Sequence, residues 1–258
     1  MSTKVVTSDT TPYLSKLISF ESERNVYIYG KLCLPRISTR LGLVLFHGGK
    51  AGSSKRFNFL QPALAKNGIA SLAIDFRGKG KSSEIYERST LNDRLVDAKA
   101  AINFFTNYLK QVRIGILGVS LAGDTVRLLK ELSAVKTILL IGPVAVSDNL
   151  TNMFPPHKAY GLSKKTNSWK ESTVFSLLKN FKGSKLIIYG DKENIATPEI
   201  IEDFKRAVVD SGQFVILKNA GHNPFLVDKK ATEEIRKEQT VSRQKTINIL
   251  IRFLRKHF

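Results

Sequence analysis

The sequence predicts an α/β fold with a mostly parallel sheet, an N-terminal antiparallel hairpin and helices on both faces. Three observations predict it. Several short apolar runs are continuous rather than alternating, which is typical of parallel strands buried on both faces. Strand-like and helix-like patterns alternate from about residue 42 to 144, as in right-handed βαβ units. Glycine-rich loops follow several of the runs, where an open α/β sheet places its ligands.

Residues 14–35 are expected to form the antiparallel hairpin. Residues 17–20 and 26–32 flank the polar stretch 21–25. The second segment alternates between polar and apolar side chains with period two, which favours a strand. Pro35 closes the segment. We therefore place this hairpin at an edge of the sheet.

The first central strand is predicted at the start of segment 41–49, a continuous apolar run that ends in the loop His47-Gly48-Gly49. A helical pattern follows from about 56 to 66, and 69–75 is a further buried strand. The next loop, 75–83, contains Gly-Lys-Gly-Lys-Ser. Its spacing does not fit the phosphate-binding pattern G-x-x-x-x-G-K-[ST], so we expect no nucleotide site there.

A nucleophile elbow is predicted after the long amphipathic helix expected at 91–109. The strand at 114–117 runs into Gly118-Val119-Ser120-Leu121-Ala122-Gly123, and a helical pattern that ends near residue 134 starts at once. A sharp strand–turn–helix with serine at its apex is the geometry of such an elbow. The turn requires small residues two positions before and after the serine, and Gly118 and Ala122 meet that requirement. The alternative is a glycine-rich turn in which Ser120 caps a helix.

One long segment interrupts the alternation. Residues 145–180 hold Pro155-Pro156, several Ser and Asn residues and only weak periodicity, with Trp169 and Phe175 as the main apolar anchors. A connection of this length is often functional, so we interpret 145–180 as a small cap or lid, with a passive surface excursion as the alternative. The elements around it are strands at 136–144, 184–190 and 213–218 and helices at 198–211 and 241–258, the last one basic and amphipathic.

Length and composition indicate one globular domain that spans residues 1–258, with 42% apolar residues for its core. No apolar run reaches the 18 residues of a membrane span. The N-terminal residues lack the apolar stretch of a signal peptide. The single cysteine, Cys33, excludes an internal disulfide and is typical of a reducing compartment. We therefore expect a cytoplasmic protein.

The formal charge of +19 raises the hypothesis of a nucleic-acid partner. However, the lysines are scattered between apolar positions along almost the whole chain, and neither a zinc-finger spacing nor an RNA-binding aromatic strand occurs. We expect a solvated basic surface with no specific nucleic-acid partner, from which attraction for anionic surfaces or substrates can follow. The sequence contains no cluster of metal-binding residues, so we expect neither a metal nor an organic cofactor.

A serine nucleophile needs a base to take its proton and an acid to orient that base. The chain has four histidines. His257 lies at the chain end, His157 in the expected cap and His47 before the glycines of an early loop, which leaves His222 as the base. The acid should follow the strand at 184–190, where Asp191 and Glu193 compete.

Taken together, five motifs resemble the α/β-hydrolase superfamily. They are Phe46-His47-Gly48-Gly49, the loop Asp75-Phe76-Arg77-Gly78-Lys79-Gly80-Lys81-Ser82, the elbow, Gly190-Asp191-Lys192-Glu193 and Gly221-His222, in the superfamily's order of nucleophile, acid and histidine. The resemblance covers about residues 26–258 and implies the α/β-hydrolase fold. Relatives place the acid three residues after the glycine that ends its strand. That position is Glu193 here, although most relatives have aspartate, and Asp191 is the second choice.

The resemblance also implies an oxyanion hole made of the backbone N–H groups of Leu121 and Gly49. The implied subfamilies are carboxylesterases, feruloyl or cinnamoyl esterases and serine-aminopeptidase-like hydrolases. The expected activity is hydrolysis of a small-molecule carboxylic ester with a small to medium acyl group, through an acyl-enzyme on Ser120. Thioesterase and peptidase activity are the enzymatic alternatives, and a catalytically silent binding protein is the alternative of another class. The oligomeric state is left open.

Overall fold

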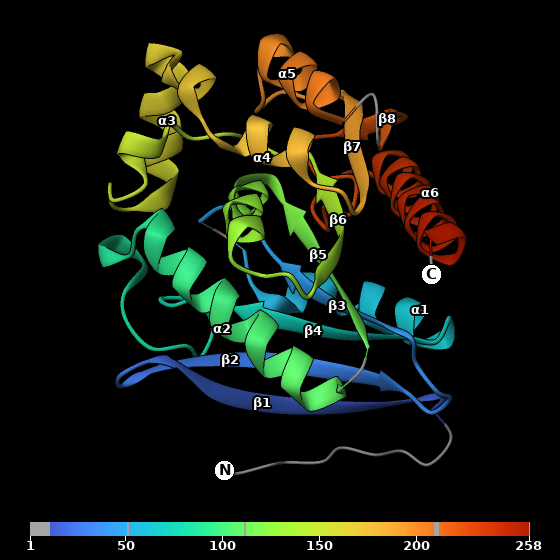
Figure 1. The fold of residues 1–258 in the computed structure, drawn as a ribbon. Helices are drawn as coiled ribbons and strands as arrows, with labels where there is room; N and C mark the ends of the chain where they lie inside the picture. Colours follow the sequence, from blue (N-terminus) through green and yellow to red (C-terminus); the bar gives the residue numbers. More distant parts are fainter. Residues whose placement is uncertain (1–10, 51, 111, 209–211, 258) are drawn as a thin grey trace.

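The computed structural model describes residues 11–50, 52–110, 112–208 and 212–257, and its described part is arranged around one eight-stranded sheet (Figure 1). The strands are β1 (Tyr13–Glu23), β2 (Val26–Pro35), β3 (Leu41–Phe46), β4 (Ile69–Asp75), β5 (Arg113–Val119), β6 (Val135–Ile141), β7 (Ser184–Lys192) and β8 (Gln213–Gly221). The α-helices are α1 (Leu60–Lys66), α2 (Leu91–Leu109), α3 (Pro156–Thr166), α4 (Val174–Asn180), α5 (Pro198–Val208) and α6 (Glu233–His257).

The strand order is β1-β2-β4-β3-β5-β6-β7-β8. β2 pairs in antiparallel fashion with β1 and β4, and all other pairs are parallel. The predicted mostly parallel sheet with an N-terminal antiparallel hairpin at its edge is therefore confirmed. The chain winds from β3 to β4 on one side and later returns to β5 on the other side of β3. The order thus reverses between β3 and β5, and the carboxyl ends of strands at such a point are where open sheets bind ligands.

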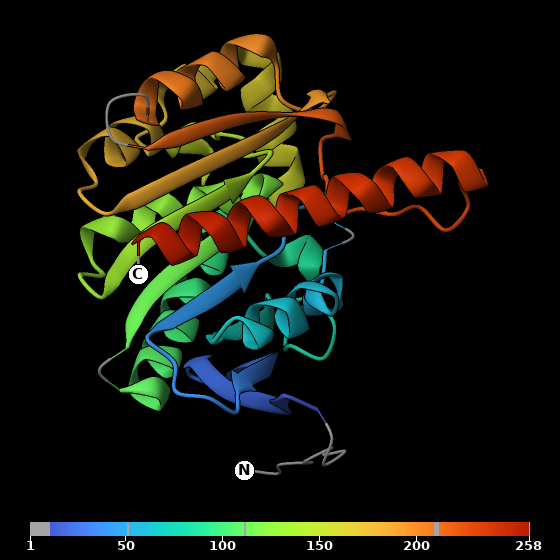
Figure 2. The same cartoon turned by 90° about the vertical axis from the view of Figure 1, so that its right-hand side faces the viewer.

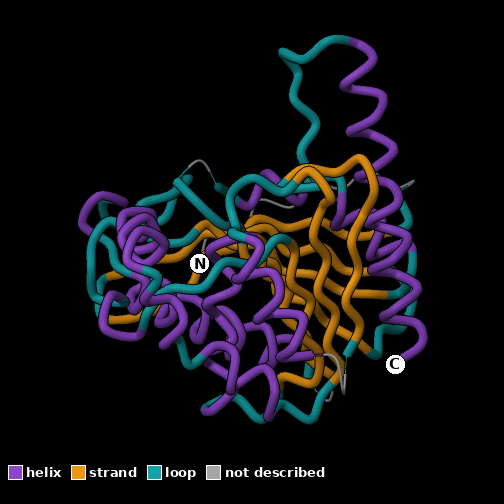
Figure 3. The backbone as a smooth tube through the Cα atoms, turned by 90° about the horizontal axis from the view of Figure 1, so that it is seen from above, coloured by secondary structure: helices purple, strands orange, loops and turns teal. Residues whose placement is uncertain are grey.

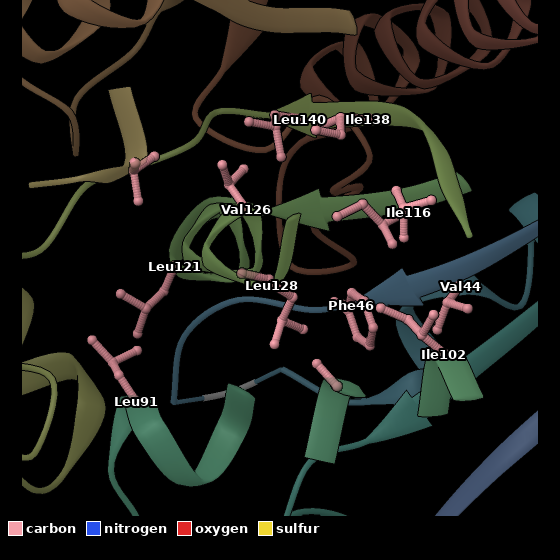
Figure 4. Close-up of a cluster of buried hydrophobic side chains, with 14 of the residues drawn as sticks. Val44, Phe46, Leu91, Ile102, Ile116, Leu121, Val126, Leu128, Ile138 and Leu140 are labelled. Atoms are coloured by element: carbon pink, nitrogen blue, oxygen red, sulfur yellow. The ribbon is translucent and has the colours of Figure 1, made fainter. Parts of the chain in front are cut away.

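Helices cover both faces of the sheet and enclose two hydrophobic clusters. α1 and α6 pack on one face (Figure 2), where Leu64 and Leu250 join strand residues such as Leu45. The larger cluster on the other face involves α2, α4, α5 and the 3₁₀ helix η3 (Ser120–Lys130). Figure 4 shows part of it, with Ile102 of α2 and Val126 of η3 directed toward side chains of the central strands. Runs that are apolar on every residue, such as β3, fit this two-sided burial.

Several predicted boundaries differ from the structure. The segment 56–66 is a short 3₁₀ helix, η1 (Ser54–Phe57), followed by α1 from Leu60. A continuous helix from residue 56 would place Pro62 in its interior, where proline lacks the N–H and clashes with the preceding turn. The helix after Ser120 is 3₁₀ rather than α and ends at Lys130, not near 134.

Element boundaries in the C-terminal half also differ from the predicted ones, with three elements longer and one shorter. β7 and β8 each continue beyond the predicted residues 190 and 218, and α6 begins at Glu233 instead of 241. β6 ends at Ile141, before the predicted residue 144, because Gly142 adopts a positive φ of 51° and Pro143 follows. The last residues predicted for the helix at 198–211, and residue 258, lie outside the described residues.

The segment 145–180 carries the short 3₁₀ helices η4 (Asp148–Leu150) and η5 (Ser168–Glu171) in addition to α3 and α4. Its apolar anchors are in place, since Trp169 is buried and packs edge-on against Phe175. At the opposite edge of the molecule, the start of α6 and the loop before it project beyond the sheet (Figure 3). Within the described ranges, none of the helices combines the length and the apolar character that crossing a bilayer requires.

A buried ion network fixes the loop after β4. The Arg77 guanidinium donates to Asp97 of α2 through Nε and Nη2 (3.0 and 2.8 Å) and to Glu23 of β1 and Asp93 of α2 through Nη1. The Asp97 side chain is fully buried and also accepts the Arg77 backbone N–H at 2.9 Å. Arg77 thus joins the β4 loop, α2 and the edge hairpin.

Replacing Arg77 by methionine should destabilise the fold strongly, because the Asp97 carboxylate would stay buried without a cation. Loss of one partner of a buried ion pair costs about 3–5 kcal/mol of unfolding free energy. The control is Lys99→Met, which removes an exposed ion pair to Glu131 and should cost less than about 1 kcal/mol. Urea unfolding measures both, and equal effects of the two substitutions would contradict the structural role of Arg77.

Candidate active site

Ser120 lies at the turn between β5 and η3 with a positive φ of 55°, a conformation that costs a non-glycine residue energy and needs support from its surroundings. Gly118 allows the tight turn, since a Cβ on it would lie 2.6 Å from the Ala122 carbonyl oxygen. The chain therefore has the strained strand–turn–helix expected from the sequence. The N-cap position of η3 is Val119, and Ser120 is the first residue of the helix, so the alternative interpretation of Ser120 as the capping residue does not match this helix.

The structure brings Ser120 and His222 together, although they are 102 residues apart in the sequence. The Ser120 hydroxyl Oγ lies 2.8 Å from His222 Nε2. The other ring nitrogen, Nδ1, lies 2.8 and 2.9 Å from the two carboxylate oxygens of Glu193. A carboxylate can only accept, so Nδ1 carries a proton and Nε2 of the neutral ring is free to accept the serine proton.

The second candidate acid, Asp191, lies elsewhere. Its side chain is exposed, and its Oδ1 accepts the backbone N–H of Ala220 at 3.2 Å. Among the contacts of the described residues, none joins Asp191 to His222. Of the two carboxylates that the sequence left in competition, Glu193 is the one that contacts the imidazole.

The surroundings of Glu193 favour its ionised form. Burial by itself would raise the pKa of this carboxyl, but hydrogen bonds from His222 and from the backbone N–H groups of Ile195 and Ala196 outweigh burial and hold the pKa below its ordinary value. The same contacts fix the carboxylate in place. Gly142 lets the backbone of His222 approach closely, since a Cβ at Gly142 would collide with the His222 carbonyl oxygen.

The His47-Gly48-Gly49 loop, which follows the neighbouring strand β3, lies against the elbow. A Cβ on Gly48 would lie 2.7 Å from Ser120 Cβ and 3.1 Å from the backbone nitrogen of Leu121, so only glycine permits this approach. Gly49 has a positive φ of 49° and open space beside its Cα. Of the residues named for the oxyanion hole, Gly49 follows Gly48 in the chain and lines the same cavity as Ser120, and Leu121 directly follows Ser120.

His47 is buried and belongs to the scaffold of this loop. Its Nδ1 lies 3.1 Å from the Gly48 carbonyl oxygen, and burial together with the charge of Arg94 lowers its pKa to about 3. The neutral ring therefore donates from Nδ1 to Gly48. Because a peptide unit is planar and trans, this bond turns the Gly49 N–H away from the His47 ring. Arg94 of α2 fixes the preceding peptide unit by donating to the His47 carbonyl oxygen at 2.6 Å.

Three polar residues that contact the site were not found from the sequence. Tyr160 and Lys164 of α3 donate to the Ile195 carbonyl oxygen at 2.8 and 2.6 Å, and the N–H of Ile195 donates to Glu193. Arg94 is the third. The Tyr160–Lys164 spacing of four residues places both on one face of a helix, but this pattern does not say which loop that face contacts.

A cavity of about 200 Å³ opens beside Ser120. Its wall combines the His47-Gly48-Gly49 loop and His222 with apolar side chains. The lining residues are His47, Gly48, Gly49, Gly52, Arg56, Phe57, Val119, Ser120, His222, Asn223, Phe225 and Leu226.

We also searched for a metal site and for a cysteine nucleophile. Among the described residues, no group of three or more His, Cys, Asp or Glu side chains could hold a metal ion. Cys33 is buried, and burial raises the pKa of its thiol to about 11, so little nucleophilic thiolate forms at neutral pH.

Comparisons with known proteins agree with this fold. The model of the family described as "Serine aminopeptidase, S33" matches residues 38–178, a segment that includes Ser120 and ends before Glu193 and His222. No curated protein matches the sequence.

Solved structures with the same α/β-hydrolase fold include two esterases and a peptidase. The Pyrococcus furiosus esterase Pf2001 has a TM-score of 0.68 at 19% identity, over 98% of this chain and 97% of its own. Est1E from Butyrivibrio proteoclasticus, solved with ferulic acid bound, has a TM-score of 0.66 at 15% identity, over 90% and 98%. The Pyrococcus horikoshii acylaminoacyl peptidase has a TM-score of 0.70 at 18% identity, over 96% of this chain and 42% of its own.

The lowered pKa of Glu193 predicts a pH-dependent contribution to stability. A carboxyl with a depressed folded-state pKa stabilises the fold fully above its ordinary value of 4.5, and this stabilisation is lost as pH falls through the folded-state pKa. The free energy of unfolding lost on Glu193→Gln should therefore be larger at pH 6.5 than at pH 3. Urea titrations at both pH values measure it, and a loss independent of pH would contradict the assigned environment.

Proposed function

This chain belongs to the serine aminopeptidase (S33) family of α/β-hydrolases, and from that premise we propose that it is a serine hydrolase that cleaves carboxylic esters. The observation that carries the proposal is the continuous hydrogen-bonded series Ser120–His222–Glu193 at the carboxyl edge of the sheet. Serine, histidine and a carboxylate in this order are the parts that nucleophilic acyl transfer requires.

In the proposed reaction, Ser120 Oγ attacks the ester carbonyl while His222 Nε2 takes the hydroxyl proton. Glu193 stabilises the imidazolium and keeps the ring oriented. The N–H groups of Gly49 and Leu121 stabilise the oxyanion. The tetrahedral intermediate collapses, His222 gives its proton to the leaving alcohol, and an acyl-enzyme remains on Ser120.

Water then completes the cycle. His222 removes a proton from the water as it attacks the acyl-enzyme, and returns that proton to Ser120 Oγ when the acid is released. The cavity of about 200 Å³ has apolar side chains such as Phe57 and Val119 in its wall, which suits a small to medium acyl group. Residues 145–180 would act as the cap, since their helix α3 contacts the Glu193 loop through Tyr160 and Lys164.

Peptide-bond hydrolysis is the second candidate, favoured by the family description and by the peptidase among the similar structures. An aminopeptidase binds the free ammonium group of its substrate, and a carboxylate is the natural partner for that cation. No carboxylate lines the cavity among the described residues, where Arg56 is present instead. Ester cleavage therefore fits the cavity better.

A fluorophosphonate probe tests the nucleophile. It should label the wild-type protein and fail to label Ser120→Ala, whose kcat on a 4-nitrophenyl ester should fall by at least about 10⁴-fold. Ser176→Ala, at an exposed position of α4, is the matched control and should be labelled normally. Correctly folded wild type that remains unlabelled would refute the enzyme and favour the silent binding protein.

The acid is tested by comparing Glu193→Gln with Asp191→Asn on the same ester. Glu193→Gln should lower kcat by about 10³- to 10⁴-fold, because the neutral amide stabilises neither the required tautomer nor the imidazolium. Asp191→Asn should retain kcat within about tenfold, since Asp191 contacts the backbone of β8. If only Asp191→Asn is inactive, Glu193 is not the acid.

A further inference from the structure

The cavity beside Ser120 has an arginine in a largely apolar wall. Arg56, on the 3₁₀ helix η1, lines it together with Phe57, Val119 and Phe225. Apart from the two histidines, Arg56 is the one side chain able to carry a charge among the described residues that line the cavity. The proposed cleavage of a neutral ester does not require a cation at this position.

Further positive charges contact the His47-Gly48-Gly49 loop or the residue after it. Arg94 donates to the carbonyl oxygen of His47, a residue of the cavity lining, at 2.6 Å. The Lys79 ammonium donates to the carbonyl oxygen of Lys50, the residue after Gly49. Burial is the largest cause of the lowered pKa of His47, and the positive charges of Arg94, Lys79 and Arg56 lower it further. These charges indicate a positive electrostatic potential at His47. Burial lowers the pKa of Arg94 only to about 10, so it stays charged at neutral pH.

Two carboxylates that contact the loops around the cavity have a histidine or cationic partner. Glu193 is hydrogen-bonded to His222 through both oxygens, and Glu87 lies 3.8 Å from Lys50. In the sequence, segments 47–57 and 75–83 together carry six Lys or Arg residues and one Asp, an excess of positive charge in line with the net charge of +19 for the chain.

We propose that this site selects esters that carry a carboxylate, and that Arg56 binds that carboxylate while Ser120 attacks the ester carbonyl. The inference rests on the proposed function and names its substrate class. A guanidinium binds a carboxylate through two parallel hydrogen bonds, so it orients the substrate as well as attracting it. A cleft with cations around its floor also concentrates anionic substrates before they bind.

Two matched substrate pairs test the proposal and locate the charge. In the acyl pair, the 4-nitrophenyl monoester of adipic acid is compared with its methyl ester, which has a neutral group at the far end. In the alcohol pair, 4-acetoxybenzoate is compared with methyl 4-acetoxybenzoate. The measured quantity is the ratio of kcat/KM for the anionic and the neutral member of each pair, so a general loss of activity in a variant cancels.

The ratio should fall about three- to tenfold in Arg56→Gln and further in Arg56→Glu, and Arg56→Lys should restore part of it. Arg252→Gln, an exposed position in the C-terminal part of α6, removes the same charge outside the cavity wall and should leave the ratio unchanged. The wild-type ratio should also decrease as ionic strength rises, because salt screens the attraction. An effect in either pair supports the proposal and shows which side of the ester carries the carboxylate.

Hydrolysis of all four esters with ratios that Arg56→Gln leaves within twofold of wild type would overturn this inference and retain the proposed function. A fall of the same size in Arg252→Gln would also overturn it, because the effect would then come from net charge. If folded wild type hydrolyses none of the four esters, the proposed function itself fails and the substrate class with it.

Discussion

The backbone strain at Ser120 is the constraint on which the rest of the site depends. A positive φ at a non-glycine residue persists only where its surroundings enforce it. Here β5, which lies between β3 and β6 in the centre of the sheet, fixes the residues before Ser120. Gly118 lets the turn after Ser120 lie close to the end of β5, and Gly48 lets the loop after β3 lie close to Ser120. The half-buried hydroxyl consequently lies at the carboxyl edge of the sheet, 2.8 Å from Nε2 of the His222 ring.

The reversal of strand order between β3 and β5 brings the separate parts of the site together. The His47-Gly48-Gly49 loop follows β3, Ser120 follows β5, Glu193 follows β7 and His222 follows β8. Each of these groups lies just beyond a strand whose neighbours keep it in register. Side chains of α2 and α3 add to this positioning, since Arg94 donates to the His47 carbonyl oxygen and Tyr160 and Lys164 donate to that of Ile195.

Charge has two distinct roles around this site. The buried Arg77–Asp97 ion pair connects α2 to the loop after β4 and stabilises the fold. Arg94 and Arg56 lie close to the cavity, where their charges lower the pKa of His47. The sequence distributes the high net charge of the chain almost evenly. The structure shows that one of these charges, the Arg56 guanidinium, lies in the cavity wall.

The sequence by itself determined the strand pattern and the strand–turn–helix at Ser120, and it singled out His222 as the candidate base. Each of these depends on periodicity, on small residues at fixed spacing or on the scarcity of histidine. From the residues alone Asp191 and Glu193 stayed in competition, since both lie within three residues of Gly190, and the family resemblance favoured Glu193. In the structure Asp191 is still part of β7, whereas Glu193 lies just beyond it and contacts Nδ1 of His222. The break between η1 and α1 has a local cause instead, because Pro62 cannot lie inside a helix that begins at residue 56. The contacts of Arg94, Tyr160 and Lys164, and the position of Arg56 in the cavity wall, join segments far apart in the chain. Packing of the whole fold decided them, and no local pattern of residues carries that information.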